Sequence, residues 1–342
     1  MADNTAARLG QINQSGDTDA VYLRTFGGEV ITAFDVANVM LPRTFQKKGT
    51  GKSVQFPRLG TASAAYHTVG TELTGNSYNA AELLVSPDPQ LVSNYFLDNY
   101  DEVITHFEER QPIAYAMAQE LSTICDKHVI HEGIAGSRLT AVGSELPTGT
   151  SVNGNLTFNA SNSLLLTTEQ SGTGASTTAA KAQAWLDALQ KCAQRMDELN
   201  VPKMGRFVVV RPREVYPLIV AAQTSGLQLI NKDIGGVGSI SEGTIGNVLG
   251  FDIISSNNLP LTDLSADTGV YTYHKADYSA TVGLVGVDRS IAVANWRGLT
   301  TSADYIPDKL GTLLIARYIK GIKYLRPEAL IELKLATGTV TA

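Results

Sequence analysis

Glycine and proline interrupt residues 43–100 too often for a helix of normal length to form there. The interrupting residues are Gly49, Gly51, Pro57, Gly60, Gly70, Gly75, Pro87 and Pro89. Between them lie short runs such as Val54–Phe56 and Glu82–Val85, which have the length and composition of strands. The segment therefore predicts hairpins and an extended loop that protrudes from the rest of the fold.

Two later stretches carry apolar residues at helical spacing. The first is expected to run from Pro112 to Glu132, with Ile113, Met117, Leu121 and Ile124 on one face, and to stop at Gly133. The second is expected to begin at Thr178 and to end at Val201–Pro202. Its apolar face carries Ala182, Trp185, Leu186, Leu189, Ala193 and Met196. The long segment between the helices, residues 139–178, is rich in Ser, Thr, Asn and Gly and predicts a loop.

The second half of the chain alternates strand patterns with loops. The expected strands are Arg206–Val210, Phe251–Ser255, Val270–Tyr273, Ala280–Val287, Leu313–Ile319 and Ile331–Leu335. In the last of these, Glu332 and Lys334 alternate with three apolar residues and are expected on the opposite face. Together with the two helices, this pattern predicts an α+β fold.

Composition and charge exclude several classes of protein. Hydrophobic residues make up 43% of the 342 residues, enough for a sizeable core and too many for a disordered chain. The net charge of −6 gives no chain-wide basic field for nucleic acid. Two cysteines, Cys125 and Cys192, cannot form a disulfide framework. We expect no signal peptide and no membrane span, and a reducing cytoplasmic origin, because no basic and apolar leader or long apolar run is visible.

Motifs for catalysis or cofactor binding are weak. Gly49-Thr50-Gly51-Lys52-Ser53 resembles the end of a phosphate-binding loop, which makes a nucleotide-binding protein the alternative function. However, Gln46 replaces the upstream glycine, and Pro57 falls where the following helix should run. A flexible turn is therefore favoured. His128 and His131 lie three apart, but only His128 is expected on the apolar face of the helix, so a shared metal ion is not expected. We expect neither an enzyme nor a cofactor.

Charges are distributed unevenly along the chain. Residues 36–71 contain no acidic residue but five basic ones: Arg43, Lys47, Lys48, Lys52 and Arg58. Residues 98–109 contain no Lys or Arg but five acidic ones: Asp98, Asp101, Glu102, Glu108 and Glu109. Opposite charge on two segments suggests contacts between subunits, where it sets register and orientation more than affinity. The competing interpretation, two solvated faces without a partner, is equally open.

Three motifs, in order along most of the chain, resemble one protein family. They are Phe26–Phe34, Gly51–Gly60 and Leu325–Ala329, and they resemble the major capsid proteins of short-tailed bacteriophages of the autographivirus type. The segment Gly250–Pro260 also resembles a strand and turn of tailed-phage shell proteins in general. The resemblance implies the Hong Kong 97-type fold.

The resemblance also implies a division of the chain. The expected parts are an N-terminal arm (1–45), an extended loop (46–97), a peripheral domain with a spine helix and the following loop (98–178), an axial domain (179–295), and strands that return to the peripheral domain (296–342). The function it implies is self-assembly into hexamers and pentamers that form an icosahedral head around double-stranded DNA. The implied partners are other copies, a scaffolding protein, a portal protein, a decoration protein, and DNA through loose contacts. The implied location is the virion, assembled in the cytoplasm of the bacterial host without a membrane.

Overall fold

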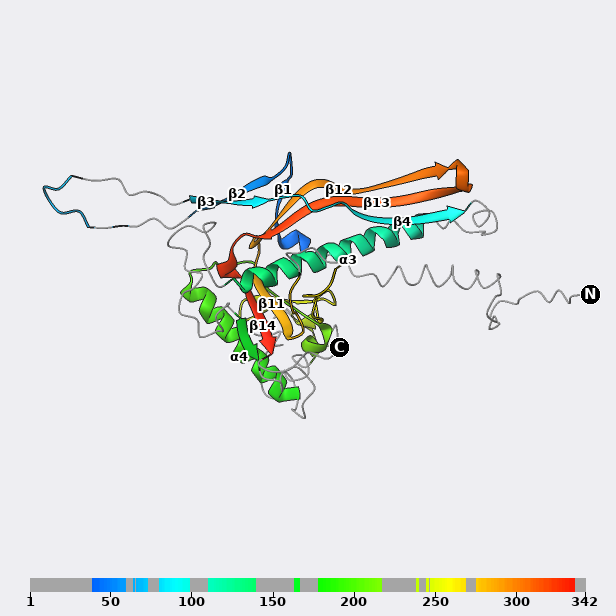
Figure 1. Cartoon of the computed structure of the whole chain (residues 1–342). Helices are drawn as coiled ribbons and strands as arrows, with labels where there is room; N and C mark the ends of the chain where they lie inside the picture. The colour runs from blue at the N-terminus through cyan, green and yellow to red at the C-terminus, as the bar shows by residue number, and fades with distance from the viewer. Residues whose placement is uncertain are drawn as a thin grey trace, which may run out of the picture. The chain divides into compact units, whose positions relative to one another are not determined.

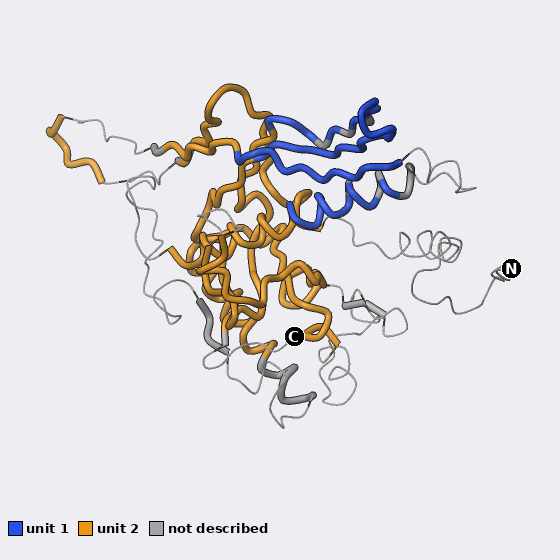
Figure 2. The backbone as a smooth tube through the Cα atoms, turned by 45° about the vertical axis from the view of Figure 1, so that its right-hand side comes forward, with its two compact units in different colours: residues 1–38, 88–125, 296–320 blue, residues 39–87, 126–295, 321–342 orange. Residues whose placement is uncertain are grey.

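The computed structural model describes residues 39–59, 64, 66–72, 80–98, 110–139, 163–166, 178–216, 238–239, 244–245, 247–268 and 275–335. The chain divides into two units, which Figure 2 distinguishes by colour. Unit 1 contains residues 1–38, 88–125 and 296–320, and unit 2 contains residues 39–87, 126–295 and 321–342. The five domain segments expected from the sequence stay predictions.

Unit 1 is built from long strands and the first part of a long helix. Strand β4 (Leu91–Asp98) pairs antiparallel with β13 (Gly311–Tyr324), with Asp98 opposite Gly311 and Leu91 opposite Tyr318. A short 3-10 turn, Pro307–Lys309, joins β13 to β12 (Ile291–Ile306). These strands belong to a four-stranded sheet of order β1-β12-β13-β4, whose first strand, β1 (Phe45–Lys48), is assigned to unit 2. Buried apolar side chains come from the helix and the strands: Met117, Leu121, Cys125, Leu97, Leu314, Ala316 and Tyr318.

Where the structure describes it, the segment interrupted by glycine and proline forms strands and turns and no α-helix, as expected. Strand β1 (Phe45–Lys48) follows a 3-10 turn at Leu41–Arg43 and pairs parallel with the first residues of β12. Strands β2 (Val54–Leu59) and β3 (Ala80–Val85) form an antiparallel pair. Alternate side chains of this pair are buried, namely Val54, Phe56, Leu83 and Val85. The period of two matches a hairpin with one packed face.

Unit 2 has a six-stranded sheet at its centre. Its order is β5-β14-β11-β6-β10-β9, and the strands are β5 (Ser163–Leu166), β14 (Ile331–Leu335), β11 (Thr281–Val287), β6 (Arg206–Val210), β10 (Phe251–Ser255) and β9 (Asn247–Val248). Side chains of β6 alternate between two cores: Val208 and Val210 pack with helix α4 (Thr178–Glu198), while Phe207 and Val209 pack with the last part of helix α3. Strand β6 is therefore buried on both faces, which explains its continuous apolar sequence.

Helix α3 runs over Arg110–Ser137, drawn in Figure 1 as the long teal helix, so the expected stop at Gly133 is wrong. A Cβ atom at Gly133 would lie 2.6 Å from Leu284 Cδ2, and one at Gly136 would lie 2.7 Å from Tyr324 Cβ. These two glycines let the helix pack close to neighbouring strands. A single glycine can serve as a helix stop or as a packing position, and the sequence pattern does not distinguish the two.

The other expected helix and strands agree with the structure where it describes them. The loop expected over residues 139–178 is wrong at Ser163–Leu166, which form β5 because they pair in parallel with β14, a strand distant in sequence. Helix α4 carries Trp185, Leu189 and Met196 on its buried face, and the expected strands in β6, β10, β11, β13 and β14 are confirmed. Two short strands, β7 (Gly238–Ser239) and β8 (Thr244–Ile245), form a small pair, and a last 3-10 turn spans Pro327–Ala329. The expected strand Val270–Tyr273 lies outside the described residues. Among the helices described, none has the length and apolar character that crossing a bilayer requires.

Candidate assembly surfaces and their internal anchors

The two arginines of the basic segment hold the subunit together internally. Arg43 forms ion pairs with Asp252 and Asp288, each at 3.3 Å. Arg58 is buried and donates a hydrogen bond from Nη2 to the Tyr324 carbonyl oxygen at 2.7 Å, with its guanidinium 5.8 Å from the Tyr324 ring centroid. These arginines therefore hold the extended segment against other residues of unit 2.

The three lysines of the basic segment remain on the surface. Lys47, Lys48 and Lys52 are all exposed. Lys47 donates a hydrogen bond from Nζ to the Gln55 carbonyl oxygen at 3.0 Å and lies 5.6 Å from the Phe56 ring centroid. Between β1 and β2 the chain turns at Gly51, which has a positive φ of 74°. The lysines therefore remain available for a contact with another molecule.

Of the five acidic residues in the expected charge pairing, the structure describes Asp98 alone. Asp98 is partly buried at the end of β4 in unit 1. Asp101, Glu102, Glu108 and Glu109 lie outside the described residues. The pairing of the acidic and basic segments between copies of the chain stays a prediction.

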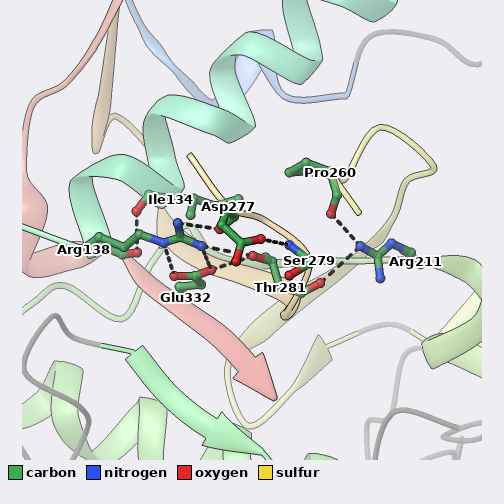
Figure 3. Close-up of polar contacts among 9 residues, drawn as sticks. Ile134, Arg138, Arg211, Pro260, Asp277, Ser279, Thr281 and Glu332 are labelled. Atoms are coloured by element: carbon green, nitrogen blue, oxygen red, sulfur yellow. Dashed lines mark hydrogen bonds and ion pairs between the residues drawn. The ribbon is translucent and has the colours of Figure 1, made fainter. Parts of the chain in front are cut away.

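A buried ion pair crosses unit 2 between α3 and β14 (Figure 3). Just beyond α3, Arg138 donates from Nη2 to Glu332 Oε1 at 2.6 Å and from Nε to Oε2 at 2.7 Å. Thr281 donates its hydroxyl proton to Glu332 Oε1 at 2.6 Å, and Arg138 Nη1 donates to the Asp277 carbonyl oxygen at 2.8 Å. Burial alone would lower the pKa of Arg138, but the hydrogen bond and charge of Glu332 raise it above its ordinary value.

The sequence pattern did not reveal this anchor. Glu332 does alternate with apolar residues of β14, but its side chain is completely buried instead of facing solvent. The nearby Arg211 donates from Nη2 to the carbonyl oxygens of Pro260 and Thr281, at 2.6 and 3.1 Å, and burial lowers its pKa to about 10. A charged residue inside an apolar strand was the available signal, because a buried charge requires a partner.

A second buried charged residue holds the backbone directly before the 3-10 turn at Leu41–Arg43. Asp126, fully buried in α3, accepts hydrogen bonds from the backbone N–H groups of Val39 at 2.9 Å and Met40 at 3.1 Å. Burial raises the pKa of Asp126 although these hydrogen bonds act to lower it. The carboxylate therefore fixes the backbone at Val39 and Met40, directly before the 3-10 turn at Leu41–Arg43.

The histidine pair is structural. His131 is buried at 6% exposure and stacks on Tyr278 with ring centroids 4.7 Å apart, so its expected place off the apolar face is wrong. The reason is that His131 lies only about 60° around the helix axis from His128, within the same stripe, where Tyr278 covers it. Burial lowers the pKa of both His128 and His131 to about 4. Among the described residues, no group of three ligating side chains suited to a metal ion occurs.

The glycine segment also differs from a phosphate-binding loop. Residues 49–53 join two strands, and β2 follows them where such a loop requires a helix N-terminus. The backbone therefore does not offer the row of N–H groups that holds phosphates, and the structure does not support the nucleotide-binding alternative.

Comparisons with known proteins extend over nearly the whole chain. A family model described as Gp10A-like, major capsid protein, matches residues 55–334. The chain is 26% identical over 331 residues to the major capsid protein of Escherichia phage T7, covering 92% of each, and 25% identical over 344 residues to that of Enterobacteria phage T3, covering 94% of this chain and 93% of the relative.

Solved structures give the same result. The capsid of Cyanophage P-SCSP1u matches with a TM-score of 0.72 and 30% identity, over 98% of this chain and 100% of that one. The mature capsid of bacteriophage PhiM1 matches with a TM-score of 0.69 over 97% of this chain and 93% of that one, and at 16% identity this second likeness concerns the fold alone.

Proposed function

Because the chain belongs to the Gp10A-like family of major capsid proteins, we propose that its assembly depends on exposed segments carried by two rigid units. The chain is a major capsid protein, a structural component of a phage virion whose shell consists of many copies. The expected Hong Kong 97-type α+β fold is confirmed by the likeness to solved phage capsids. The observation that carries the function is the match at 30% identity over 98% of the chain.

The proposed arrangement is an icosahedral head of hexamers and pentamers around double-stranded DNA. A closed shell requires one chain to make several similar but unequal contacts, so rigid cores must be joined by segments that adapt. The two-sided core around β6 and the Arg138–Glu332 pair support a rigid unit 2. The exposed turn at Gly51 and the lysines beside it support an adaptable extended loop.

Each of the five segments of the chain has its own proposed role in the shell subunit. Residues 1–45 act as an arm, 46–97 as the extended loop, 98–178 as a peripheral domain with the spine helix, 179–295 as an axial domain, and 296–342 as strands that return to the peripheral domain. The length of α3, 28 residues, and the β2–β3 pair support this division. Each contact is individually weak, which allows errors to be corrected, and many contacts together give a durable shell.

The proposed partners complete the assembly pathway. They are further copies of the chain, a scaffolding protein, a portal protein and a decoration protein, with assembly in the cytoplasm of the bacterial host. Contacts with packaged DNA are loose, because the net charge of −6 opposes strong attraction to phosphate groups. The protein acts without catalysis.

The test is assembly of the full chain, expressed alone and together with its phage's scaffolding protein. Electron microscopy and light scattering are expected to detect hexamers, pentamers or closed shells tens of nanometres across. A strictly monomeric chain at all concentrations, with and without scaffolding protein, would contradict the proposal. Calorimetric titration with ATP and GTP provides the check on the alternative, and no binding is expected.

A further inference from the structure

Strained turns gather at one end of the six-stranded sheet of unit 2. Of the four non-glycine residues with positive φ in the described part of the chain, three are Asn200 (56°), Leu249 (53°) and Arg289 (65°). Asn200 precedes β6, Leu249 precedes β10, and Arg289 follows β11. Because β10 is parallel to β6 and β11 is antiparallel to it, all three turns lie at the same end of the sheet. Such strain often accompanies a functional surface.

Leu249 is the least expected residue among them. Leu249 and Gly250, with φ values of 53° and 85°, form the two-residue connection between β9 and β10. A hairpin turn with positive φ at both positions favours Asn, Asp or Gly at the first, because a larger side chain is strained there. Leu249 is nevertheless present and is 52% exposed. Neither the turn nor the core of the subunit accounts for a leucine at this position.

A second exposed apolar side chain lies at the same end of the sheet. Met204 is 89% exposed in the turn before β6. Phe207 of β6 and Asp252 of β10 lie opposite each other in the parallel strand pair. Met204 lies three residues before Phe207, and Leu249 lies three residues before Asp252. Both residues therefore lie in turns that lead into two neighbouring parallel strands at the same end of the sheet. We call Met204 and Leu249, with the turns that carry them, the sheet-end surface.

Several charged groups around the sheet-end surface are paired within the subunit. Asp197 accepts from Arg206 at 2.7 Å and from Lys203 at 3.3 Å. Asp252 and Asp288 are paired with Arg43. Beside these pairs the surface offers the apolar contact area of Leu249 and Met204, which is typical of the centre of a protein interface.

The same end of the sheet is continuous with the basic segment. The backbone N–H of Arg289 donates to the Arg43 carbonyl oxygen at 2.7 Å. Arg43 directly precedes β1, which leads to Lys47 and Lys48. The sheet-end surface therefore adjoins the segment that we propose as a contact between copies.

We propose that the sheet-end surface docks against a second copy of this chain, an inference that rests on the proposed shell function. The strained leucine is retained because its side chain is buried in the assembled state, although it is exposed in the separate subunit. This explains why a residue unfavourable for the turn occupies the turn.

The experiment compares two substitutions at one position in the full chain. Leu249→Asn suits the turn but removes the apolar contact, and Leu249→Met keeps the apolar contact without suiting the turn better. For Leu249→Asn we expect a melting temperature of the unassembled subunit that is unchanged or higher, with a critical concentration for assembly raised about tenfold. For Leu249→Met we expect assembly close to that of the original chain. Met204→Gln provides an independent variant with the same expected loss of assembly.

Each result has a defined meaning. Shells from Leu249→Asn and Met204→Gln at the original critical concentration would overturn the inference while leaving the shell function intact. Original shells that lose binding of another phage protein would assign the sheet-end surface to that protein and would also overturn self-docking. Failure of the unaltered chain to assemble under any condition would instead contradict the proposed function itself.

Discussion

Arg138 and Glu332 form a two-point ion pair in which the carboxylate is completely buried and the guanidinium is 22% exposed. Removing one partner of a buried pair leaves the other charge without compensation, which is far more costly than losing an exposed pair. This pair connects the residue just beyond α3 to β14 of the six-stranded sheet. It therefore links two segments that are distant in sequence.

Replacing Glu332 with Ala is expected to lower the free energy of unfolding by about 3–5 kcal/mol, because Arg138 and Thr281 lose their partner. Urea denaturation of the unassembled subunit measures the change. The matched control is Lys203→Gln, which removes the exposed pair with Asp197 and is expected to cost less than about 1 kcal/mol. Equal effects of the two substitutions would mean that Glu332 is not a structural anchor.

A substitution that usually stabilises a helix is expected to destabilise this one. Gly136→Ala gains about 1 kcal/mol of helix propensity in an ordinary helix. Here the new Cβ would lie 2.7 Å from Tyr324 Cβ and 3.0 Å from Leu330 Cδ1. A Cβ atom cannot move without its backbone, so a net loss of about 1–3 kcal/mol is expected. Thermal unfolding of the unassembled subunit measures this loss of stability. The control is Lys127→Ala, at an exposed position of α3. A Gly136→Ala variant more stable than the original chain would contradict the close packing of α3 at this glycine.

Acidification is expected to destabilise the subunit through its buried histidine. The pKa of His131 is lowered from 6.5 to about 4, mainly by burial. Between these values the unfolded chain binds a proton that the folded chain does not, so stability falls as the pH drops from 6.5 towards 4. The loss attributable to His131 is at most about 3 kcal/mol.

The measurement is urea denaturation of the unassembled subunit at several pH values. His131→Phe retains an aromatic ring against Tyr278 and removes the titrating group. Its stability is expected to vary less with pH over this range than that of the original chain. If both proteins lose stability in parallel, another group causes the acid sensitivity.

The sequence predicted the repeating parts of the fold and missed what depends on distant partners. The strands Val54–Leu59 and Ala80–Val85 were correctly expected to be extended, because glycine and proline act locally. Gly133 was misjudged because the close strand residue, Leu284, is far away in sequence. The burial of His131 depends in the same way on Tyr278.

The candidate surfaces were likewise only partly predictable from the sequence. The unequal charge of residues 36–71 was visible in the sequence, but the internal pairing of Arg43 with Asp252 and Asp288 was not. The sheet-end surface could not be found from the sequence, because the strain at Leu249 appears only once the register of β9 and β10 is known. Local propensity is encoded in short windows, whereas exposure and strain follow from tertiary pairing.

Charge reversal tests whether the basic and acidic segments meet between subunits. Replacing Lys47 and Lys48 with Glu is expected to weaken assembly, and replacing Glu108 and Glu109 with Lys in the same chain is expected to restore part of it. The critical concentration for assembly, measured by light scattering at low and moderate salt, quantifies the effect, which should shrink as salt screens the charges. Lys47 and Lys48 are exposed, so the reversal should lower the melting temperature of the separate subunit only slightly, through loss of the contacts of Lys47 with Gln55 and Phe56. If the separate and combined reversals are additive in free energy, the two segments do not contact each other.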